Sequence, residues 1–252
     1  MLSIMRNNAH NQKTGFLNYG MPPLIWTLYQ DLEHRGGELE YLGGHIGLAD
    51  LQTISKMQSR PMDFVPFTIM RSPNDRLVSF WAYLHDIRAS RSLPSVNITA
   101  WLPQMLSDSM YRLLASAGSD LDDVSATMEA IKDSMRSLFA VVGLTERFEE
   151  TLLLLKRQGI LNKISFRKHK VLASERPSFK DLPHDVQQMI ADQNGLYQQL
   201  YDFAKALFEE KLKEQDDSFW VELAEFKAEQ QKHFEEFGEC EDDEKPFGRL
   251  AL

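Results

Sequence analysis

The chain has 252 residues, 43% of them hydrophobic, which is enough for one α/β domain with a helical extension. Its formal net charge of -9 argues against a general nucleic-acid-binding protein, because phosphate contacts need a basic surface. Cys240 is the only cysteine, which excludes an intrachain disulfide and a multi-thiolate metal site. Residues 1–20 lack the apolar core of a signal peptide and no apolar run could span a membrane, so we expect a soluble, cytoplasmic protein.

The first predicted elements lie between residues 22 and 45. Apolar residues at helical spacing predict a helix over residues 22–32, which Gly36 and Gly37 terminate. A strand over residues 38–42 then leads into a glycine turn that carries His45. A histidine in such a turn is usually a structural residue with a satisfied hydrogen bond, but a neutral imidazole at a strand end can also act as a general base.

Residues 66–84 form the most informative segment. Residues 66–70 are apolar or β-prone and predict a short buried strand, and a helix is expected to begin directly after it. Ser72 is the predicted N-cap, Pro73 takes the first helical position, and Asp75 completes an acidic capping box. Two faces follow at helical spacing: an apolar one with Leu77, Phe80, Trp81 and Leu84, and a polar one with Arg76, Ser79 and Tyr83.

Arg71 lies in the predicted turn between this strand and this helix. The turn therefore combines a guanidinium with a helix N-terminus, and the helix adds the Ser79 hydroxyl two turns further on. This combination suits a phosphate, although an arginine in such a turn often only pairs with a carboxylate.

The second half of the chain alternates helix, strand and helix. Helices are predicted over residues 105–116 and 120–137, and the continuous apolar run 138–144 predicts a strand buried in a parallel sheet. Thr145 is the predicted N-cap of a helix that ends near Gly159. Residues 161–177 are basic and are expected to form a loop, two helices follow between residues 183 and 208, and residues 235–245 form an acidic, mobile tail.

Four segments resemble one family, and one of them is residues 194–204, whose N-x-x-x-x-x-L-Y-x-x-A arrangement is similar to the family's C-terminal helix. Residues 71–81 resemble the R-[DS]-P-x-x-R-x-x-S-x-[YFW] signature of Golgi-type carbohydrate sulfotransferases, including the heparan sulfate 2-O-sulfotransferase type, and of their bacterial relatives. Residues 142–148 resemble the V-G-[LV]-T-E-x-[FL] segment that follows the last core strand of these enzymes. Residues 41–48 are similar to the G-H-hydrophobic segment that precedes their phosphate-binding strand. The motifs at residues 71–81 and 142–148 follow each other in the order that the family has.

The resemblance implies an α/β fold with a parallel sheet flanked by helices and a P-loop-NTPase-like architecture. The C-terminal tail departs from the family in length and charge, and its apolar residues predict a helical extension: Phe219, Trp220, Leu223 and Phe226. The resemblance also implies a sulfotransferase that uses 3′-phosphoadenosine 5′-phosphosulfate, without a metal ion. Arg71 and Ser79 would hold the 3′-phosphate of this donor, and His45 would deprotonate the acceptor hydroxyl, which is expected to belong to a carbohydrate or a similar compound. Arg167 and Lys168 lie where relatives have a basic loop over the nucleotide, so they are secondary candidates for cofactor binding.

One part of the family pattern is not found in the sequence. These enzymes hold the 5′-phosphosulfate in a P-K-x-[GA]-[TS]-[TS] loop. The segment 12–15 resembles this loop only weakly, and we do not expect the two to be equivalent. The resemblance covers roughly residues 22–213, so we divide the chain into a sulfotransferase-like domain, 1–212, and a C-terminal extension, 213–252. Two functions stay open: a sulfotransferase, or a truncated or non-catalytic relative that at most binds the nucleotide or a partner. A nucleotide kinase is disfavoured because the chain has no G-x-x-x-x-G-K-[ST] loop.

Overall fold

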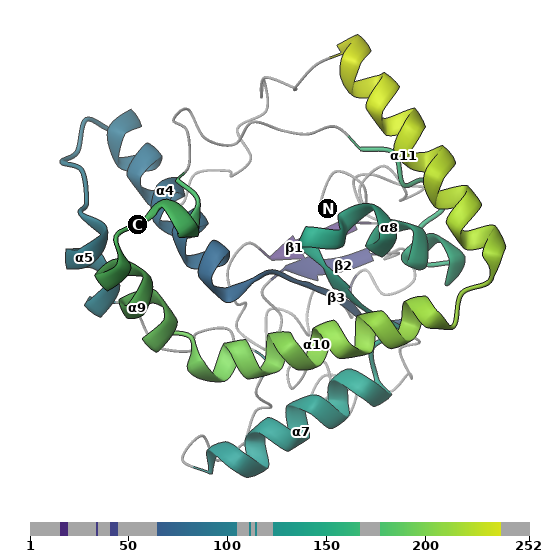
Figure 1. Ribbon diagram of the computed structural model, residues 1–252, viewed down its shortest axis with the longest axis horizontal. Coiled ribbons are helices and arrows are strands. Elements are labelled where there is room, and N and C mark those ends of the chain that lie inside the picture. The colour runs from purple at the N-terminus through teal and green to yellow at the C-terminus, as the bar shows by residue number, and fades with distance from the viewer. Residues whose placement is uncertain are drawn as a thin grey trace.

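The computed structural model describes residues 16–19, 34, 41–44, 65–104, 111, 114, 123–166 and 177–237. Figure 1 shows helices gathered around a few short strands. The described strands are β1 (Phe16–Tyr19), β2 (Tyr41–Gly44), β3 (Phe67–Met70) and β4 (Val141–Leu144). The described α-helices are α4 (Pro73–Ser90), α5 (Ile98–Trp101), α7 (Val124–Ser137), α8 (Phe148–Arg157), α9 (His184–Asp192), α10 (Gly195–Lys213) and α11 (Asp217–Phe237), and short 3₁₀ helices lie at η1 (Leu102–Gln104), η2 (Thr145–Arg147) and η3 (Phe179–Asp181).

The described strands pair in parallel. β1 pairs with β2, and β3 pairs with β4. In the second pair Phe67 lies opposite Val141 and Met70 lies opposite Leu144. A parallel pair needs a long connection, and the chain between β3 and β4 contains α4, α5 and α7. The described part of the chain is mostly helical with parallel strands, which is compatible with the predicted α/β class.

β4 is completely buried, as predicted for the apolar run 138–144. The strand begins only at Val141, because α7 extends to Ser137 and the next three residues turn the chain. In Figure 1 α8 lies above the strands and α10 lies below them, and both helices contact β4. This close packing requires a residue without a side chain in the strand, because a Cβ on Gly143 would overlap the Thr151 side chain of α8.

The main hydrophobic core forms between the strand pair β3–β4, α7, which precedes β4, and the helices that follow β4 in the sequence. α8 and α10 each bury one apolar face, and α11 packs against α8. The first part of the predicted C-terminal extension therefore packs on the rest of the chain through apolar side chains. Buried side chains of the three helices are Leu152, Leu153, Leu154, Leu155, Tyr197, Leu200, Ala204, Phe208, Leu212, Phe219, Leu223 and Phe226.

A smaller hydrophobic cluster joins α4, α5 and α9, which lie together at the left of Figure 1. α4 begins at Pro73 as predicted, but its predicted apolar face is partly wrong. Phe80 is 38% exposed, and Val78 and Ala82 are buried instead. Trp81 is half-buried, and its indole N–H donates to a backbone carbonyl at 2.9 Å. The buried members of the cluster are Leu77, Val78, Trp101, Leu102, Val186 and Ile190.

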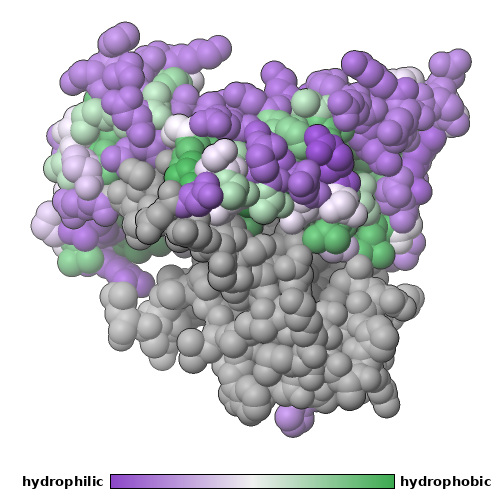
Figure 2. All heavy atoms as spheres, turned by 90° about the horizontal axis from the view of Figure 1, so that it is seen from below, coloured by the Kyte–Doolittle hydropathy of each residue, from purple (hydrophilic) through white to green (hydrophobic). Residues whose placement is uncertain are grey.

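Hydrophilic residues dominate the described surface that Figure 2 shows, and hydrophobic residues form small separate patches on it. Exposed large apolar side chains come from several elements: Val65, Phe80, Leu93, Val124, Leu138, Trp220 and Val221. Among the described helices, none combines the length and the apolar composition that crossing a membrane requires.

Candidate functional site

The predicted phosphate-binding segment begins where β3 ends. Arg71 and Ser72 form the turn between β3 and α4, and we call these two residues the Arg71 turn. β4 runs parallel to β3, so the residues that follow it, Thr145 and Glu146, emerge at the same edge of the strand pair. Ligands of open parallel sheets bind outside this carboxyl edge, which makes the Arg71 turn the candidate site.

Two backbone carbonyls at this edge accept hydrogen bonds from side chains far along the chain. The Thr145 hydroxyl donates to the Met70 carbonyl at 3.0 Å, and the Tyr197 hydroxyl donates to the Arg71 carbonyl at 3.1 Å. Tyr197 belongs to α10 and is only 1% exposed. Its burial raises the pKa of the phenol, which the bond to Arg71 only partly opposes, so the hydroxyl keeps its proton and remains a donor at neutral pH.

The Glu146 carboxylate connects the Arg71 turn to α10. Oε1 accepts the Ser72 N–H at 2.7 Å, and Oε2 accepts the Tyr201 hydroxyl at 3.0 Å. Burial, together with this hydrogen bond to the carboxylate, raises the pKa of Tyr201 well above its ordinary value, so the phenol stays a donor. Glu146 itself is exposed, and its carboxylate therefore also meets water.

α4 adds a second guanidinium beside the turn. Arg76 is half-buried, and its guanidinium carbon lies 5.5 Å from the centroid of the Tyr197 ring, within the range of a cation–π interaction. Burial lowers the pKa of Arg76, but an arginine stays charged at neutral pH. Arg71 and Arg76 thus bring two positive charges to one strand-turn-helix unit.

The helix start is as predicted, but the capping interactions differ. Ser72 is the N-cap of α4 and Pro73 is its first residue, yet the Ser72 side chain makes no capping hydrogen bond, so the predicted capping box with Asp75 is wrong. The Ser72 N–H has the Glu146 carboxylate as its acceptor instead. Thr145 is not the N-cap of α8 either. It is the first residue of η2, its hydroxyl bonds to the carbonyl at the end of β3, and Arg147 is the N-cap of α8.

The structure describes two of the five predicted site residues. Arg71 and Ser79 are both half-buried and belong to the same unit, Arg71 in the turn and Ser79 in the second turn of α4. The two members of the predicted 3′-phosphate pair thus lie on consecutive segments, the turn that follows β3 and the helix that follows this turn. The other predicted residues lie outside the described ones. They are the predicted base His45, the secondary candidates Arg167 and Lys168, and the segment 12–15, which weakly resembles the 5′-phosphosulfate loop.

Glu146 and Tyr201 occupy fixed positions of the motifs at residues 142–148 and 194–204, but the sequence reasoning assigns neither of them a role at the site, and it does not single out Tyr197. A signal for Glu146 exists, however. If residues 66–70 and 138–144 form neighbouring parallel strands, the residues that follow each strand must lie at one edge of the sheet. The two tyrosines have no such signal, since Tyr197 is 126 residues away from its partner Arg71.

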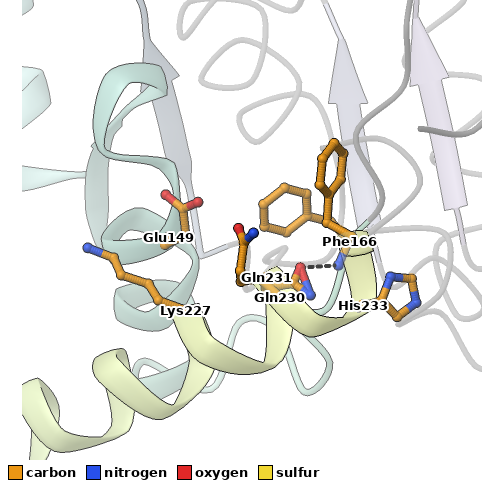
Figure 3. A pocket seen from close by; sticks show the side chains of 7 residues that line it. Glu149, Phe166, Lys227, Gln230, Gln231 and His233 are labelled. Atoms are coloured by element: carbon orange, nitrogen blue, oxygen red, sulfur yellow. Dashed lines mark hydrogen bonds between the residues drawn. The ribbon is translucent and has the colours of Figure 1, made fainter. Parts of the chain in front are cut away.

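A small hollow of about 180 Å³ lies elsewhere, between α8, α11 and the segment that follows α8. Figure 3 shows the Gln230 side chain beside Phe166, whose backbone N–H donates to the amide oxygen of Gln230 at 3.0 Å. The hollow shares no residue with the Arg71 turn, so we do not assign it to the candidate site. Its lining is mixed: Glu149, Phe166, Lys227, Gln230, Gln231, His233 and Phe234.

The described site residues have the chemistry of anion recognition. A guanidinium can bind a phosphate through two parallel hydrogen bonds, and a serine hydroxyl can add another. Within the ranges that the structure describes, no three His, Cys, Asp or Glu side chains lie close enough together to hold a metal ion.

A comparison of the chain with models of protein families finds no match, and neither does a comparison with curated proteins. The resemblance to sulfotransferases is therefore a hypothesis that rests on the motifs at residues 71–81, 142–148, 41–48 and 194–204.

Proposed function

We propose that this protein binds 3′-phosphoadenosine 5′-phosphosulfate through Arg71 and Ser79 and transfers its sulfuryl group to a hydroxyl of a carbohydrate or a similar acceptor. One observation carries the proposal. The Arg71 turn lies at the carboxyl edge of a parallel strand pair, where side chains from two other segments hold its backbone. Because the backbone that carries the guanidinium is already held in place, binding a phosphate need not order it, which lowers the entropic cost of binding.

Arg71 and Ser79 contact the 3′-phosphate in this proposal. Arginine presents its N–H groups in a fork that matches two phosphate oxygens, and serine adds one hydroxyl. Both side chains are half-buried, so water competes less with their hydrogen bonds than it does at a fully exposed surface. The roles of His45 as base, and of Arg167 and Lys168 over the nucleotide, rest on the sequence resemblance.

Sulfuryl transfer needs more than the binding of the 3′-phosphate by Arg71 and Ser79. The acceptor oxygen attacks sulfur, the bond from sulfur to the 5′-phosphate oxygen breaks, and the acceptor proton passes to a base, for which His45 is the candidate. Fixed donors must also stabilise the charge on the migrating group, as in phosphoryl transfer. The P-loop-like sulfotransferase architecture and a cytoplasmic location belong to the same proposal, because the resemblance and the composition favour them.

A second candidate function uses the same two residues, Arg71 and Ser79, without catalysis. In this case the protein is a non-catalytic relative of sulfotransferases that binds the nucleotide. One observation favours this second function: the segment 12–15 resembles the 5′-phosphosulfate loop only weakly. Transfer of labelled sulfate from the donor to a panel of glycans and small alcohols separates the two functions. Turnover that His45→Ala abolishes supports the enzyme, whereas nucleotide binding without turnover supports the binding protein.

Adenosine 3′,5′-bisphosphate is expected to stabilise the folded protein, and Arg71→Ala is expected to remove this effect. At about 100 times its dissociation constant, a ligand of the folded state adds roughly 2.7 kcal/mol to the free energy of unfolding. Thermal unfolding with and without the nucleotide measures the shift. Adenosine 5′-monophosphate lacks the 3′-phosphate, so any smaller effect that it has should be the same in both proteins.

Arg136→Ala is the matched control for this experiment. Arg136 is an exposed arginine of α7 that pairs with Asp133 at 3.4 Å, and its removal should leave the nucleotide effect unchanged. Two results would contradict the proposal: a well-folded wild-type protein whose unfolding does not respond to millimolar nucleotide, or an Arg71→Ala variant that the nucleotide stabilises as much as the wild type.

A further inference from the structure

The Glu146 carboxylate bridges the Arg71 turn and α10 although it belongs to neither. It lies in η2, directly after β4, and reaches the turn only because β4 and β3 are parallel neighbours. One oxygen accepts the backbone N–H of Ser72, and the other accepts the hydroxyl of Tyr201. A single side chain therefore ties the residue next to Arg71 to a long helix of the main core.

The position of this carboxylate argues against a direct role in binding an anion. A negative charge at the N-terminus of α4 is favourable, because it complements the helix dipole and accepts an N–H that has no acceptor within the helix. From the same position the charge would repel a phosphate that touched it. Glu146 is therefore unsuited to be a ligand of the nucleotide, and it is well placed to hold the backbone of a residue that is.

We propose that Glu146 is a positioning residue, which fixes the Ser72 N–H relative to α10 and so keeps the Arg71 turn in the shape that binds the nucleotide phosphate. The inference rests on the proposed function and extends it to a residue that does not touch the ligand. Tyr201 supports this role by holding the second carboxylate oxygen at 3.0 Å. Because Glu146 is exposed, replacing it removes two hydrogen bonds without opening a cavity in the core.

Four variants test this role. Glu146→Ala removes the acceptor, Glu146→Gln keeps an acceptor oxygen for the backbone N–H without the charge, and Tyr201→Phe removes only the phenolic hydroxyl. Glu222→Ala is the matched control. The Glu222 carboxylate also bridges two donors, Lys156 at 2.7 Å and Arg157 at 3.1 Å, but it ties α11 to α8 and does not contact the turn.

Two measurements are made on each variant: the dissociation constant of adenosine 3′,5′-bisphosphate by calorimetry, and amide hydrogen exchange of residues 70–76. Glu146→Ala is expected to weaken nucleotide binding about tenfold, because a misplaced binding group loses much of its effect, and to speed exchange in the turn. Glu146→Gln should keep slow exchange and bind the nucleotide as tightly as the wild type or more tightly, since a repelling charge is gone. Tyr201→Phe should fall between these variants, and Glu222→Ala should change neither quantity.

Each outcome decides between the proposals. If Arg71→Ala loses nucleotide binding and Glu146→Ala does not, the inference is overturned and the proposed function stands. Equal weakening by Glu146→Ala and Glu146→Gln, with slow exchange in both, also overturns it, because the charge and not the position would then matter. If the wild type binds no nucleotide, the proposed function fails, and only the hydrogen-exchange measurement tests the role of Glu146. Faster exchange of the turn in Glu146→Ala then supports the inference that Glu146 holds the Arg71 turn, and unchanged exchange overturns this inference.

Discussion

Phe219→Ala is expected to lower the free energy of unfolding by about 3–5 kcal/mol, the usual cost of removing a fully buried phenylalanine ring. Phe219 lies in the first turn of α11 and is 0% exposed. Its ring centroid is 5.4 Å from the guanidinium carbon of Arg157 at the end of α8. The side chain therefore joins α11 to the main core, and denaturant titration measures what this junction contributes.

Trp220→Ala, one position further on, is the control. Trp220 is 44% exposed and meets Phe219 edge to face, with ring centroids 5.1 Å apart. Although its ring is larger, its removal is expected to cost only about 0.5–1.5 kcal/mol, the range of such an aromatic contact. Equal unfolding midpoints for the two variants would contradict the packing of α11 and favour a separate C-terminal extension from residue 213.

Gly143→Ala is expected to destabilise the protein by about 1–3 kcal/mol or more, because β4 has no room for a side chain at this position. The new Cβ would overlap Cγ2 of Thr151 and would lie 3.0 Å from its hydroxyl. Thr151 cannot easily turn away. Its hydroxyl accepts the Leu144 N–H at 3.0 Å and donates to the Leu144 carbonyl at 3.1 Å, both in the core. Thermal and denaturant unfolding of the variant measure the loss.

Gly195→Ala separates this steric effect from the general effect of replacing glycine. Gly195 begins α10, where an added Cβ would meet no neighbouring atom within 4 Å, so alanine should be neutral or stabilise by about 0.4–1 kcal/mol. The double variant Gly143→Ala/Thr151→Ser lacks the overlapping methyl group but keeps the hydroxyl, and it should recover part of the lost stability. A double variant no more stable than Gly143→Ala would show that the assigned overlap is not the cause.

Local sequence patterns predict the elements around the site well. A polar N-cap followed by Pro73 starts α4, and the uninterrupted apolar run contains β4. The same patterns fail for the packed face of α4, because apolar side chains occur on several faces of this helix and their spacing does not select one. The helices packed against α4 determine which of its faces is buried, so Ala82 is buried while the larger Phe80 is exposed.

The contacts that shape the candidate site are beyond local patterns. Ser72 is 74 residues from Glu146 in the sequence, and Glu146 is 55 residues from Tyr201. Such pairs exist only once two parallel strands and α10 are placed relative to one another, which is tertiary information. The motif points to Arg71 and Ser79 as candidate ligands of the phosphate, and the structure adds the residues that hold the turn.

The hydrogen bond between Tyr197 and Arg71 also has a consequence for the time at which the turn can form during synthesis. The two residues are 126 positions apart, so at about 5–20 residues per second Arg71 leaves the ribosome roughly 6–25 s before Tyr197. Throughout this interval α10 is incomplete, and until Leu144 has emerged β3 also lacks its partner strand β4. Closing so long a loop is entropically unfavourable until those contacts exist. The packing of β4 against α8 involves neighbours in the sequence and should precede it. A nascent chain that stalls before Tyr197 would carry the complete arginine-serine motif without the hydrogen bonds from α10 that hold the Arg71 turn.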